Sequence, residues 1–573
     1  MSRDEGADDT GFVQFERFLE DWSRRDFLKR AGGAAAYMAF LGGATQFLEA
    51  CAGGSNNATT TAKKGGHVVE GWPSDVRTFN SMLSSDTQSN LCIGLMFDGL
   101  TSQNKAGDIV PALAESWKTS ADGLTYTFKL RSGLKWSDGQ PITSDDVKFT
   151  YQLAYDAQYG DFASPRRGDL SKYIARIDTP DPQTAIITTT QVYAPFLGSH
   201  GNYGILPKHV LGSMTGKQLN AADFNSGPTV SNGAYKFVKY DKGSQVTMAR
   251  NDNYWAGPAY LDQWIYKVVA DTVAVTNQLK TGELDIGFVD AGQFDSLKTV
   301  STVAMTEFTR PSFTFYAYQL DPSKSQLFQD KAVRQALLYA LDRQSMATAI
   351  WFGHATVANS VEPPTSWTYK EKPAVVYNFD KAKAESMLDA AGWTKGSDGI
   401  RAKNGVKLKF TMITNAGAKQ REASLTYMQQ AWHDIGVDAT PSLIQFPQLV
   451  TQIVSIRTFD VFLVGFNWSV DPDEAALFHS RNTVPGGFNG AFFKNDQVDS
   501  ILDQALSTVD RAKRKQLYGQ FQDLMSDLVP TPLLVFDHGI FGVNTRVQGT
   551  DFGAFSQYQL RPWHHQVWVT DGK

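Results

Sequence analysis

The sequence contains very little cysteine, with only Cys51 and Cys92 among 573 residues. Two cysteines exclude a framework of several disulfides and leave too few thiols for a cysteine-rich zinc site. Neither sign of charge predominates, since 54 Lys and Arg residues stand against 59 Asp and Glu residues, and the sequence has no long basic run. A net charge of −5 spread along the chain gives no electrostatic reason to expect nucleic acid as a partner. The expected partner is a small molecule or a protein.

The familiar short catalytic motifs are missing as well. The sequence has no Gly-x-Ser-x-Gly elbow, no His-Glu-x-x-His zinc pair, no phosphate-binding glycine loop that ends in Lys-Ser or Lys-Thr, and no dinucleotide fingerprint. His564 and His565 are adjacent, so on a strand they would point to opposite faces and would not chelate one metal ion. Asp145 and Asp146 are explained by capping of a helix N-terminus. The residues give no reason to expect catalysis, a metal or a cofactor.

Apolar residues, in contrast, are abundant. The chain is 42% hydrophobic and 12% aromatic, which is enough to fill globular cores and excludes a disordered chain. Its length leaves room for roughly three or four units of ordinary domain size.

The first 50 residues are predicted to be an export signal. Residues 23–29 include Arg24 and Arg25 and resemble a twin-arginine signal, and residues 31–48 are uncharged, weakly apolar and rich in Ala and Gly. So many small residues make a poor permanent membrane anchor. The four residues that end at Cys51 resemble a lipobox, in which Cys51 is acylated, although Glu49 stands where a small or aliphatic residue is usual. The alternative is a cysteine without a lipid. Residues 51–66 are expected to form a flexible tether.

One stretch of the folded region predicts a strand, a tight turn and a capped helix within a short distance. Thr125–Leu130 alternates polar and apolar residues as a half-buried strand does, and residues 137–141 have the composition of a turn. Thr143 is suited to cap the following helix, with Asp146 in the reciprocal position of a capping box. Apolar residues then recur at helical spacing.

This stretch resembles the extracellular solute-binding proteins of family 5, which deliver peptides, nickel and other solutes to ABC importers. Further blocks resemble the family in the family's order: residues 97–100, 111–117, 231–237, 251–255, 279–286 and 333–343. The resemblance runs from about residue 65 to the end of the chain. It implies an α/β, two-lobe periplasmic-binding-protein-like fold of type II, cluster C, with an extra subdomain in the first lobe. It also implies a transport receptor that is not an enzyme.

The expected division of the chain follows from this resemblance and from the pattern of strands, helices and turn-rich segments. After the signal peptide (1–50) and the tether (51–66) come the first segment of lobe I (67–95), the extra subdomain (96–211), the second segment of lobe I (212–311), lobe II (312–530) and the last segment of lobe I (531–573). Chain crossings between the lobes would form a hinge, and the cleft between the lobes would hold the ligand.

Two helices of lobe II have clear start signals. Asp330 is predicted to cap a helix that continues through Ile350, and Asp380 is predicted to cap another that stops at Gly392. Arg334 and Asp342, within the first of these segments, are expected to have structural roles.

Residues 465–474 carry the most chemistry. The resemblance implies that a tryptophan and an aspartate three residues later hold a peptide's N-terminal amine in the peptide-binding branches, and Trp468 and Asp471 match that spacing. An ammonium moved out of water into a closed cleft needs a carboxylate partner. A second interpretation is local: Asp471 at N-cap, Pro472 at N1 and Glu474 at N3 would start a helix through Phe478. Peptide binders usually carry extra residues between that aspartate and a later Asp-Pro, and here the two coincide. Both interpretations stay open.

The ligand class is narrowed by one further departure from the family. In the dipeptide branch an arginine takes the ligand's C-terminal carboxylate, but the corresponding residues here are 414–416, without an arginine. A longer peptide, or an uncharged solute such as an oligosaccharide, fits better. The candidate ligand-binding residues are Asp471, Trp468, Asn467, Asn415, Ser85, Thr87, Phe488 and Asn489.

The predicted function is that of a monomeric substrate-binding lipoprotein of an ABC importer. It would lie in the periplasm or on the outer face of the cytoplasmic membrane, bind an oligopeptide or similar solute, and deliver it to a membrane permease. The alternatives are a receptor for an oligosaccharide or metal chelate, and a secreted hydrolase.

Overall fold

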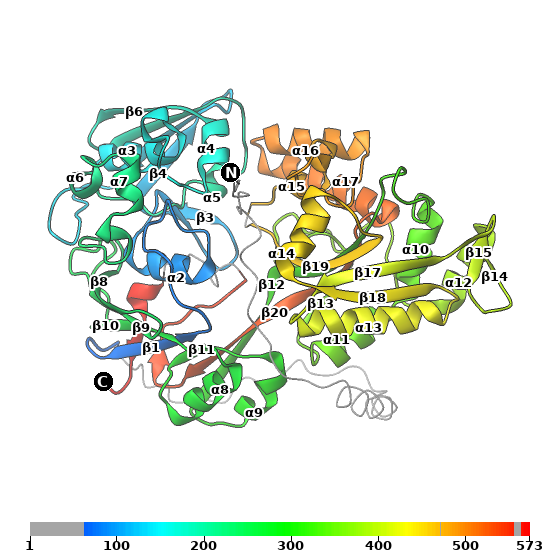
Figure 1. Cartoon of the computed structure of the whole chain (residues 1–573). Coiled ribbons are helices and arrows are strands. Elements are labelled where there is room, and N and C mark those ends of the chain that lie inside the picture. The colour runs from blue at the N-terminus through cyan, green and yellow to red at the C-terminus, as the bar shows by residue number, and fades with distance from the viewer. Residues whose placement is uncertain (1–61, 470, 555–562) are drawn as a thin grey trace, which may run out of the picture.

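The computed structural model describes residues 62–469, 471–554 and 563–573. Arg24, Arg25 and Cys51, with most of the predicted tether, lie outside the described residues. Figure 1 shows two lobes side by side, joined by two long strands, β12 (Val303–Tyr318) and β20 (Leu533–Asn544). The blue, cyan and red segments of the chain share lobe I, and the yellow and orange segments form lobe II. The two-lobe α/β fold expected from the sequence is confirmed.

One mixed sheet of 11 strands runs through both lobes. Its order is β18 (Asp438–Ile444), β17 (Lys409–Asn415), β19 (Val461–Asn467), β12, β20, β11 (Ile286–Phe288), β1 (His67–Trp72), β10 (Gln263–Val268), β9 (Gln245–Arg250) and β8 (Tyr235–Asp241), and β13 (Ala355–Val357) also pairs with β20.

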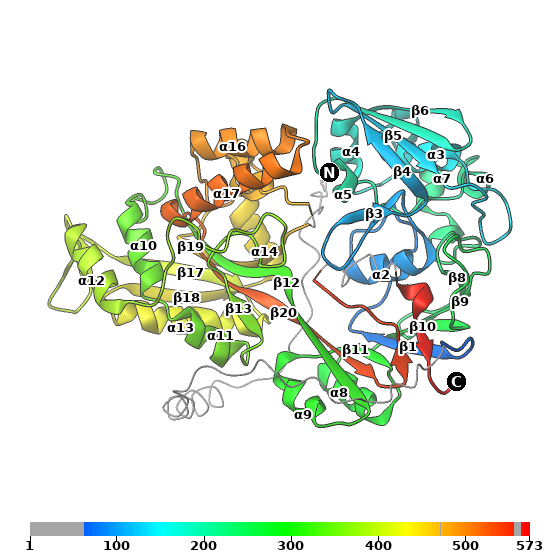
Figure 2. The same cartoon turned by 180° about the vertical axis from the view of Figure 1, so that it is seen from behind.

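The two long strands carry the sheet from one lobe to the other. β12 and β20 are antiparallel, and their register shifts between Thr309 and Phe313. On the lobe I side of this shift β20 pairs with β11, and on the lobe II side β12 pairs with β19 from Ser312 onward. Figure 2 shows the same two strands crossing between the lobes from behind. The irregular register therefore lies where the chain passes from one lobe into the other.

The region of lobe I that contains the strand-turn-helix stretch has its own sheet. β4 (Ala114–Thr119), β5 (Thr125–Leu130), β7 (Thr184–Thr189) and β6 (Ile174–Asp181) are antiparallel in that order, and α3 (Ser144–Tyr155) packs on them. The backbone N–H of Thr143 donates to Asp146 Oδ2 at 2.8 Å, so the predicted cap is confirmed. The apolar residues at helical spacing are fully buried: Val147, Tyr151 and Ala154.

In lobe II, the prediction of one helix from Asp330 through Ile350 is wrong, because the structure has two helices in this segment. α10 (Lys331–Tyr339) is capped by Asp330, as expected, and α11 (Arg343–Ile350) is capped by Asp342, whose Oδ1 accepts from the Ser345 amide at 2.9 Å. This side chain satisfies a free amide of a new helix and so allows the chain to turn there. The structural role predicted for Arg334 is confirmed by its hydrogen bond to the Leu528 carbonyl at 2.7 Å.

The remaining helices and short strands complete the layers around these sheets. The helices are α2 (Thr87–Met96), α4 (Arg167–Tyr173), α5 (Phe196–Ser199), α6 (Lys208–Leu211), α7 (Gly216–Asn220), α8 (Thr272–Thr281), α9 (Phe294–Lys298), α12 (Lys381–Ala390), α13 (Lys419–His433), α14 (Phe446–Val450), α15 (Ala475–Phe478), α16 (Asp496–Ser507) and α17 (Arg511–Leu528). The short strands are β2 (Thr101–Gln103), β3 (Ile109–Pro111), β14 (Thr394–Lys395), β15 (Arg401–Lys403), β16 (Val406–Lys407), β21 (Val547–Gln548) and β22 (Trp568–Val569). Within the described ranges, no helix combines the length and the apolar character needed to cross a bilayer.

Candidate functional site

Residues 468, 469 and 471–474 belong to the loop that follows β19, and they lie in lobe II, on the side that faces lobe I. Trp468 begins the loop and is buried, with its indole Nε1 donating to the Val361 carbonyl at 2.7 Å. Its ring packs against Phe313 and Phe478, with centroid distances of 5.1 and 6.0 Å. Trp468 therefore fixes the start of the loop to the core of lobe II.

Asp471 has a partner within lobe II, namely Arg514 of α17. Arg514 donates from Nη2 to Asp471 Oδ1 at 2.6 Å and from Nη1 to Oδ2 at 3.2 Å, and the side chains of Arg514 and Asp471 are only 4% and 12% exposed. Burial opposes the charge on Arg514, but the neighbouring carboxylate of Asp471 outweighs this and raises the pKa of Arg514. Two parallel hydrogen bonds to a carboxylate are the strongest form of this ion pair.

The capping interpretation of Asp471 is wrong. α15 begins at Ala475 with Glu474 at its N-cap position, and the carboxylate that accepts from the Ala475 amide, at 3.2 Å, is that of Asp473. Asp471 is held instead by Arg514, and the carbonyl of Pro472 accepts from the hydroxyl of Tyr518 at 2.7 Å. These contacts with α17 keep residues 471 and 472 out of the helix. The helix does end at Phe478, as predicted.

Two further acidic side chains lie in the core behind the loop. Glu474 is 0% exposed and Glu362 is 1% exposed. Burial raises the pKa of Glu474 well above its ordinary value, and the nearby carboxyl of Glu362 raises it further. Burial likewise raises the pKa of Glu362. Burial and the neighbouring carboxyl both disfavour the charged form of Glu474.

The loop also touches lobe I. Tyr193 donates from its hydroxyl to Asp473 Oδ2 at 3.3 Å, and the amide of Ala194 donates to the Leu506 carbonyl at 2.8 Å. A Cβ atom at Gly198 of α5 would lie only 2.9 Å from the Cβ of Asp471. These contacts join α5 to the region of α15, α16 and α17 at the upper side of Figure 1, and we call them the inter-lobe seam. The lobes are therefore in direct contact at this seam.

Asn467 and Asn415 lie at the ends of neighbouring strands. Asn467 is the last residue of β19, and Asn415 is the last residue of β17, which runs parallel to β19. Asn415 is almost fully buried, and its Oδ1 accepts from Arg421 Nη2 of α13 at 2.8 Å. Ligands of α/β proteins commonly bind outside the carboxyl ends of parallel strands. The structure thus brings these two candidates to one edge of the sheet, together with Arg421, which the sequence interpretation missed.

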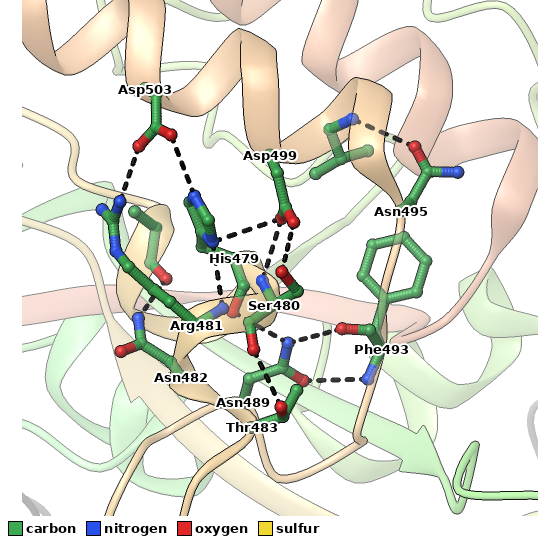
Figure 3. Close-up of polar contacts among 12 residues, drawn as sticks. His479, Ser480, Arg481, Asn482, Thr483, Asn489, Phe493, Asn495, Asp499 and Asp503 are labelled. Carbon is green, nitrogen blue, oxygen red and sulfur yellow. Dashed lines mark hydrogen bonds and ion pairs between the residues drawn. The ribbon is translucent and has the colours of Figure 1, made fainter.

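Asn489 is positioned to hold its own segment together. It is fully buried, its Nδ2 donates to the carbonyls of His479 and Phe493 at 3.2 and 2.8 Å, and its Oδ1 accepts from the Phe493 amide at 3.0 Å. Figure 3 shows this network beneath α16, where His479 lies between Asp499 and Asp503. The contacts of Asn489 are therefore those of a structural residue. Its neighbour Phe488 is half-buried and packs against the core.

Ser85 and Thr87 lie in lobe I, whereas the other candidates lie in lobe II. Thr87 is the first residue of α2 and is buried, whereas Ser85 is exposed. The helix start is capped by Asp86, whose Oδ1 accepts from the Ser89 amide at 2.9 Å.

The two adjacent histidines are not on a strand, which corrects the expectation from the sequence. They occupy a single 3-10 turn, His564–Gln566, in which His564 is buried with its ring 5.0 Å from that of Trp264. Across residues 62–469, 471–554 and 563–573, no group of three or more His, Cys, Asp or Glu side chains is arranged to hold a metal ion.

Arg514, Tyr193 and Gly198 were not among the residues predicted from the sequence. The helical spacing of the sequence could have indicated that Arg514 is buried, because it shares the buried face of α17 with Leu517, Tyr518 and Phe521. A charged residue on the apolar face of a helix needs a buried partner of opposite charge. The two residues of lobe I left no comparable signal, since their role depends on a contact with the other lobe.

Comparison with known proteins gives a consistent result. Residues 108–487 match the model of the bacterial extracellular solute-binding proteins, family 5. The chain is 30% identical over 555 residues to the oligopeptide-binding protein AppA of Bacillus subtilis, covering 94% of this chain and 99% of AppA. It is 31% identical over 532 residues to protein XP55 of Streptomyces lividans, covering 90% of this chain and 92% of XP55.

Two solved structures of similar proteins also resemble this chain in fold. The structure of B. subtilis AppA in complex with a nonapeptide has a TM-score of 0.72 and 27% identity, over 89% of this chain and 100% of that chain. NikZ of Campylobacter jejuni in complex with Ni(L-His) has a TM-score of 0.70 and 26% identity, over 85% of this chain and 96% of that chain. Because the family match covers more than half of the sequence, this chain belongs to the bacterial extracellular solute-binding proteins of family 5, which serve ABC transporters as binding proteins and are not enzymes.

Proposed function

We propose that this protein is the receptor of an ABC importer that captures an oligopeptide, or a solute of similar size, in the cleft between its lobes and delivers it to a membrane permease. The observation that carries the proposal is the similarity to AppA, because the full length of a protein bound to a nonapeptide aligns with this chain. A receptor of this kind works as a monomer that closes over its ligand.

The proposed division of the chain follows the sheet. Lobe II extends from residue 312 to residue 530 and is inserted between segments of lobe I. The register shift of β12 beside Ser312 and the start of β20 at Leu533 support these boundaries. Two strands that cross at one place form a suitable hinge.

The proposed ligand surface lies at the carboxyl ends of β17 and β19, with Asn415 and Asn467 on one side of the cleft and Ser85 at the start of α2 on the other. Asn467 Oδ1 is buried and has no hydrogen-bond partner among the described residues. A buried carbonyl oxygen of this kind is available to an N–H donor of a ligand, and a peptide backbone supplies such donors.

A metal chelate is the second candidate ligand, because NikZ in complex with Ni(L-His) is nearly as similar in structure as AppA. A chelate would be recognised by its organic groups, which is compatible with a cleft that has no cluster of metal-binding side chains among the described residues.

We further propose that the protein is exported through the twin-arginine signal at Arg24 and Arg25 and is anchored by a lipid on Cys51. Residues between Cys51 and the first strand, which begins at His67, would serve as the tether. A flexible tether of this length would allow the receptor to reach a permease without leaving the membrane surface.

Native mass spectrometry of protein purified without denaturation tests the ligand class. A retained mass that fragments into amino-acid residues supports the peptide proposal. A retained mass with the isotope pattern of a transition metal favours the chelate. Failure to retain peptides even after incubation with a nonapeptide mixture would contradict the peptide proposal.

A further inference from the structure

Asp471 is the carboxylate that would be expected to hold a ligand's amino terminus, yet in this structure both of its oxygens already accept hydrogen bonds from Arg514. We propose that Arg514 is a built-in counter-ion for Asp471, and that the receptor therefore binds ligands with a blocked or absent amino group as well as it binds those with a free one. This inference rests on the proposed function, since it concerns the ligand of the same cleft.

The first argument is charge. A ligand ammonium beside Asp471 would share one carboxylate with the guanidinium of Arg514 in a site removed from water. Two cations at that distance repel each other, and a low local dielectric strengthens the repulsion. The ligand would gain little, because the carboxylate is already neutralised.

The second argument is the rigidity of Arg514. Its side chain is 4% exposed on α17, and its guanidinium lies 5.2 Å from the centre of the Trp367 ring. Tyr518, one turn further along the same helix, holds the loop through the Pro472 carbonyl. For Arg514 to move aside for a ligand, it would have to leave a buried carboxylate without its cation, which is strongly unfavourable.

The third argument is space. Gly198 of α5 covers Asp471 from lobe I so closely that an added Cβ atom would lie 2.9 Å from the Cβ of Asp471 and 3.1 Å from Ile109 Cδ1. Asp471 thus faces a helix of the opposite lobe at the inter-lobe seam.

The other acidic side chains near the loop do not replace Asp471. Asp473 is engaged by the Tyr193 hydroxyl and the Ala475 amide. Glu474 and Glu362 are buried against each other. None of these three groups is placed to receive an ammonium from the cleft.

The ion pair itself is tested without a ligand. Asp471→Asn, Arg514→Gln and the double variant are compared by urea unfolding, with Lys515→Gln, the exposed next residue of α17, as the matched control. Each single variant is expected to raise the equilibrium constant for unfolding at least about tenfold. The increase in the double variant is expected to be at least about tenfold smaller than the product of the two single increases. Additive effects would overturn the assignment of Arg514.

The ligand preference is tested by competition. A synthetic nonapeptide mixture is prepared with free and with acetylated amino termini, both forms are offered together, and retained peptides are quantified by mass spectrometry after gel filtration. The wild-type protein and Asp471→Asn are both expected to retain the two forms within about threefold of each other, because Arg514 neutralises the carboxylate of Asp471 and Gly198 covers it. A wild-type preference of at least about tenfold for free amines, abolished by Asp471→Asn, would overturn the inference. If neither form is retained, the peptide proposal fails, while the unfolding experiment still decides whether Arg514 holds Asp471.

Discussion

The hydroxyl of Tyr193 in lobe I donates a hydrogen bond to Asp473 Oδ2 in lobe II, at 3.3 Å. The contact joins residues that are far apart in the sequence and that belong to different lobes, so it exists only when the lobes meet. It lies beside the ion pair of Asp471 and Arg514, which places the inter-lobe seam directly next to the residues expected to bind the ligand.

Tyr193→Phe is expected to weaken the closed form without disturbing the fold, because only the hydroxyl is removed. A hydrogen bond of this kind contributes about 1 kcal/mol, so affinity for a ligand identified by native mass spectrometry should fall about three- to tenfold. Isothermal titration calorimetry measures this. Tyr260→Phe, a half-buried tyrosine elsewhere in lobe I, is the control. Equal affinities in all three proteins would show that the contact does not contribute to closure.

Gly198→Val is expected to keep the lobes apart, since the added side chain would overlap the Cβ of Asp471. In the wild-type protein, a saturating ligand should reduce the radius of gyration by about an ångström through hinge closure. The variant should not show this reduction, and its affinity should fall at least about tenfold. Small-angle scattering provides the measurement.

The control for this substitution is Gly168→Val, because a Cβ atom at Gly168 meets nothing within 4 Å. A Gly198→Val protein that contracts normally with ligand would mean that the seam opens in the liganded state. A wild-type protein that does not contract at all would contradict the hinge.

Glu474→Gln is expected to remove a pH dependence of stability. Burial raises the pKa of Glu474 above its ordinary value of 4.5, so the folded protein holds this proton more tightly than the unfolded chain does. Between these two pKa values the folded state binds more protons, and stability falls as pH rises. The Gln variant lacks this proton and should show a flatter curve above pH 4.5.

Urea midpoints measured from pH 4.5 upward test the Glu474 prediction, with Glu371→Gln as a control at an exposed position. Unchanged slopes in the Glu474 variant would show that this carboxyl does not titrate differently in the folded protein.

Changing Arg24 and Arg25 together to lysine is expected to block export. The charge is kept, but the planar guanidinium groups that a receptor recognises are lost. Unprocessed precursor should therefore accumulate in the cytoplasm, as judged by immunoblotting of fractions. Normal export of the double variant would show that export does not depend on this pair of arginines.

Cys51→Ala is expected to release the protein from the membrane fraction, because the substitution removes the thiol that carries the proposed lipid. Cys92→Ala serves as the control, since Cys92 is buried in α2 and lies within the folded region. Membrane binding that resists extraction equally in both variants would exclude the lipid on Cys51.

The sequence by itself determined those features that depend on neighbouring residues. The helix cap at Thr143 and Asp146 and the helix that begins after Asp380 both follow from interactions within about one turn of helix, and each agrees with the structure. The family and the two-lobe fold could also be predicted from the sequence, because many short blocks that resemble the family occur in the family's order.

The tertiary structure alone decided the partners of the site residues. Arg514 is 43 positions from Asp471, and Gly198 belongs to the other lobe, so local patterns gave no reason to connect them. A helix cap was one of two interpretations that local sequence offered for Asp471, but a buried carboxylate gains more from a bidentate arginine than from a backbone amide. The charge of a buried side chain is set by whatever the fold brings next to it, and this is the physical reason why the chemistry of the loop could not be read from its own sequence.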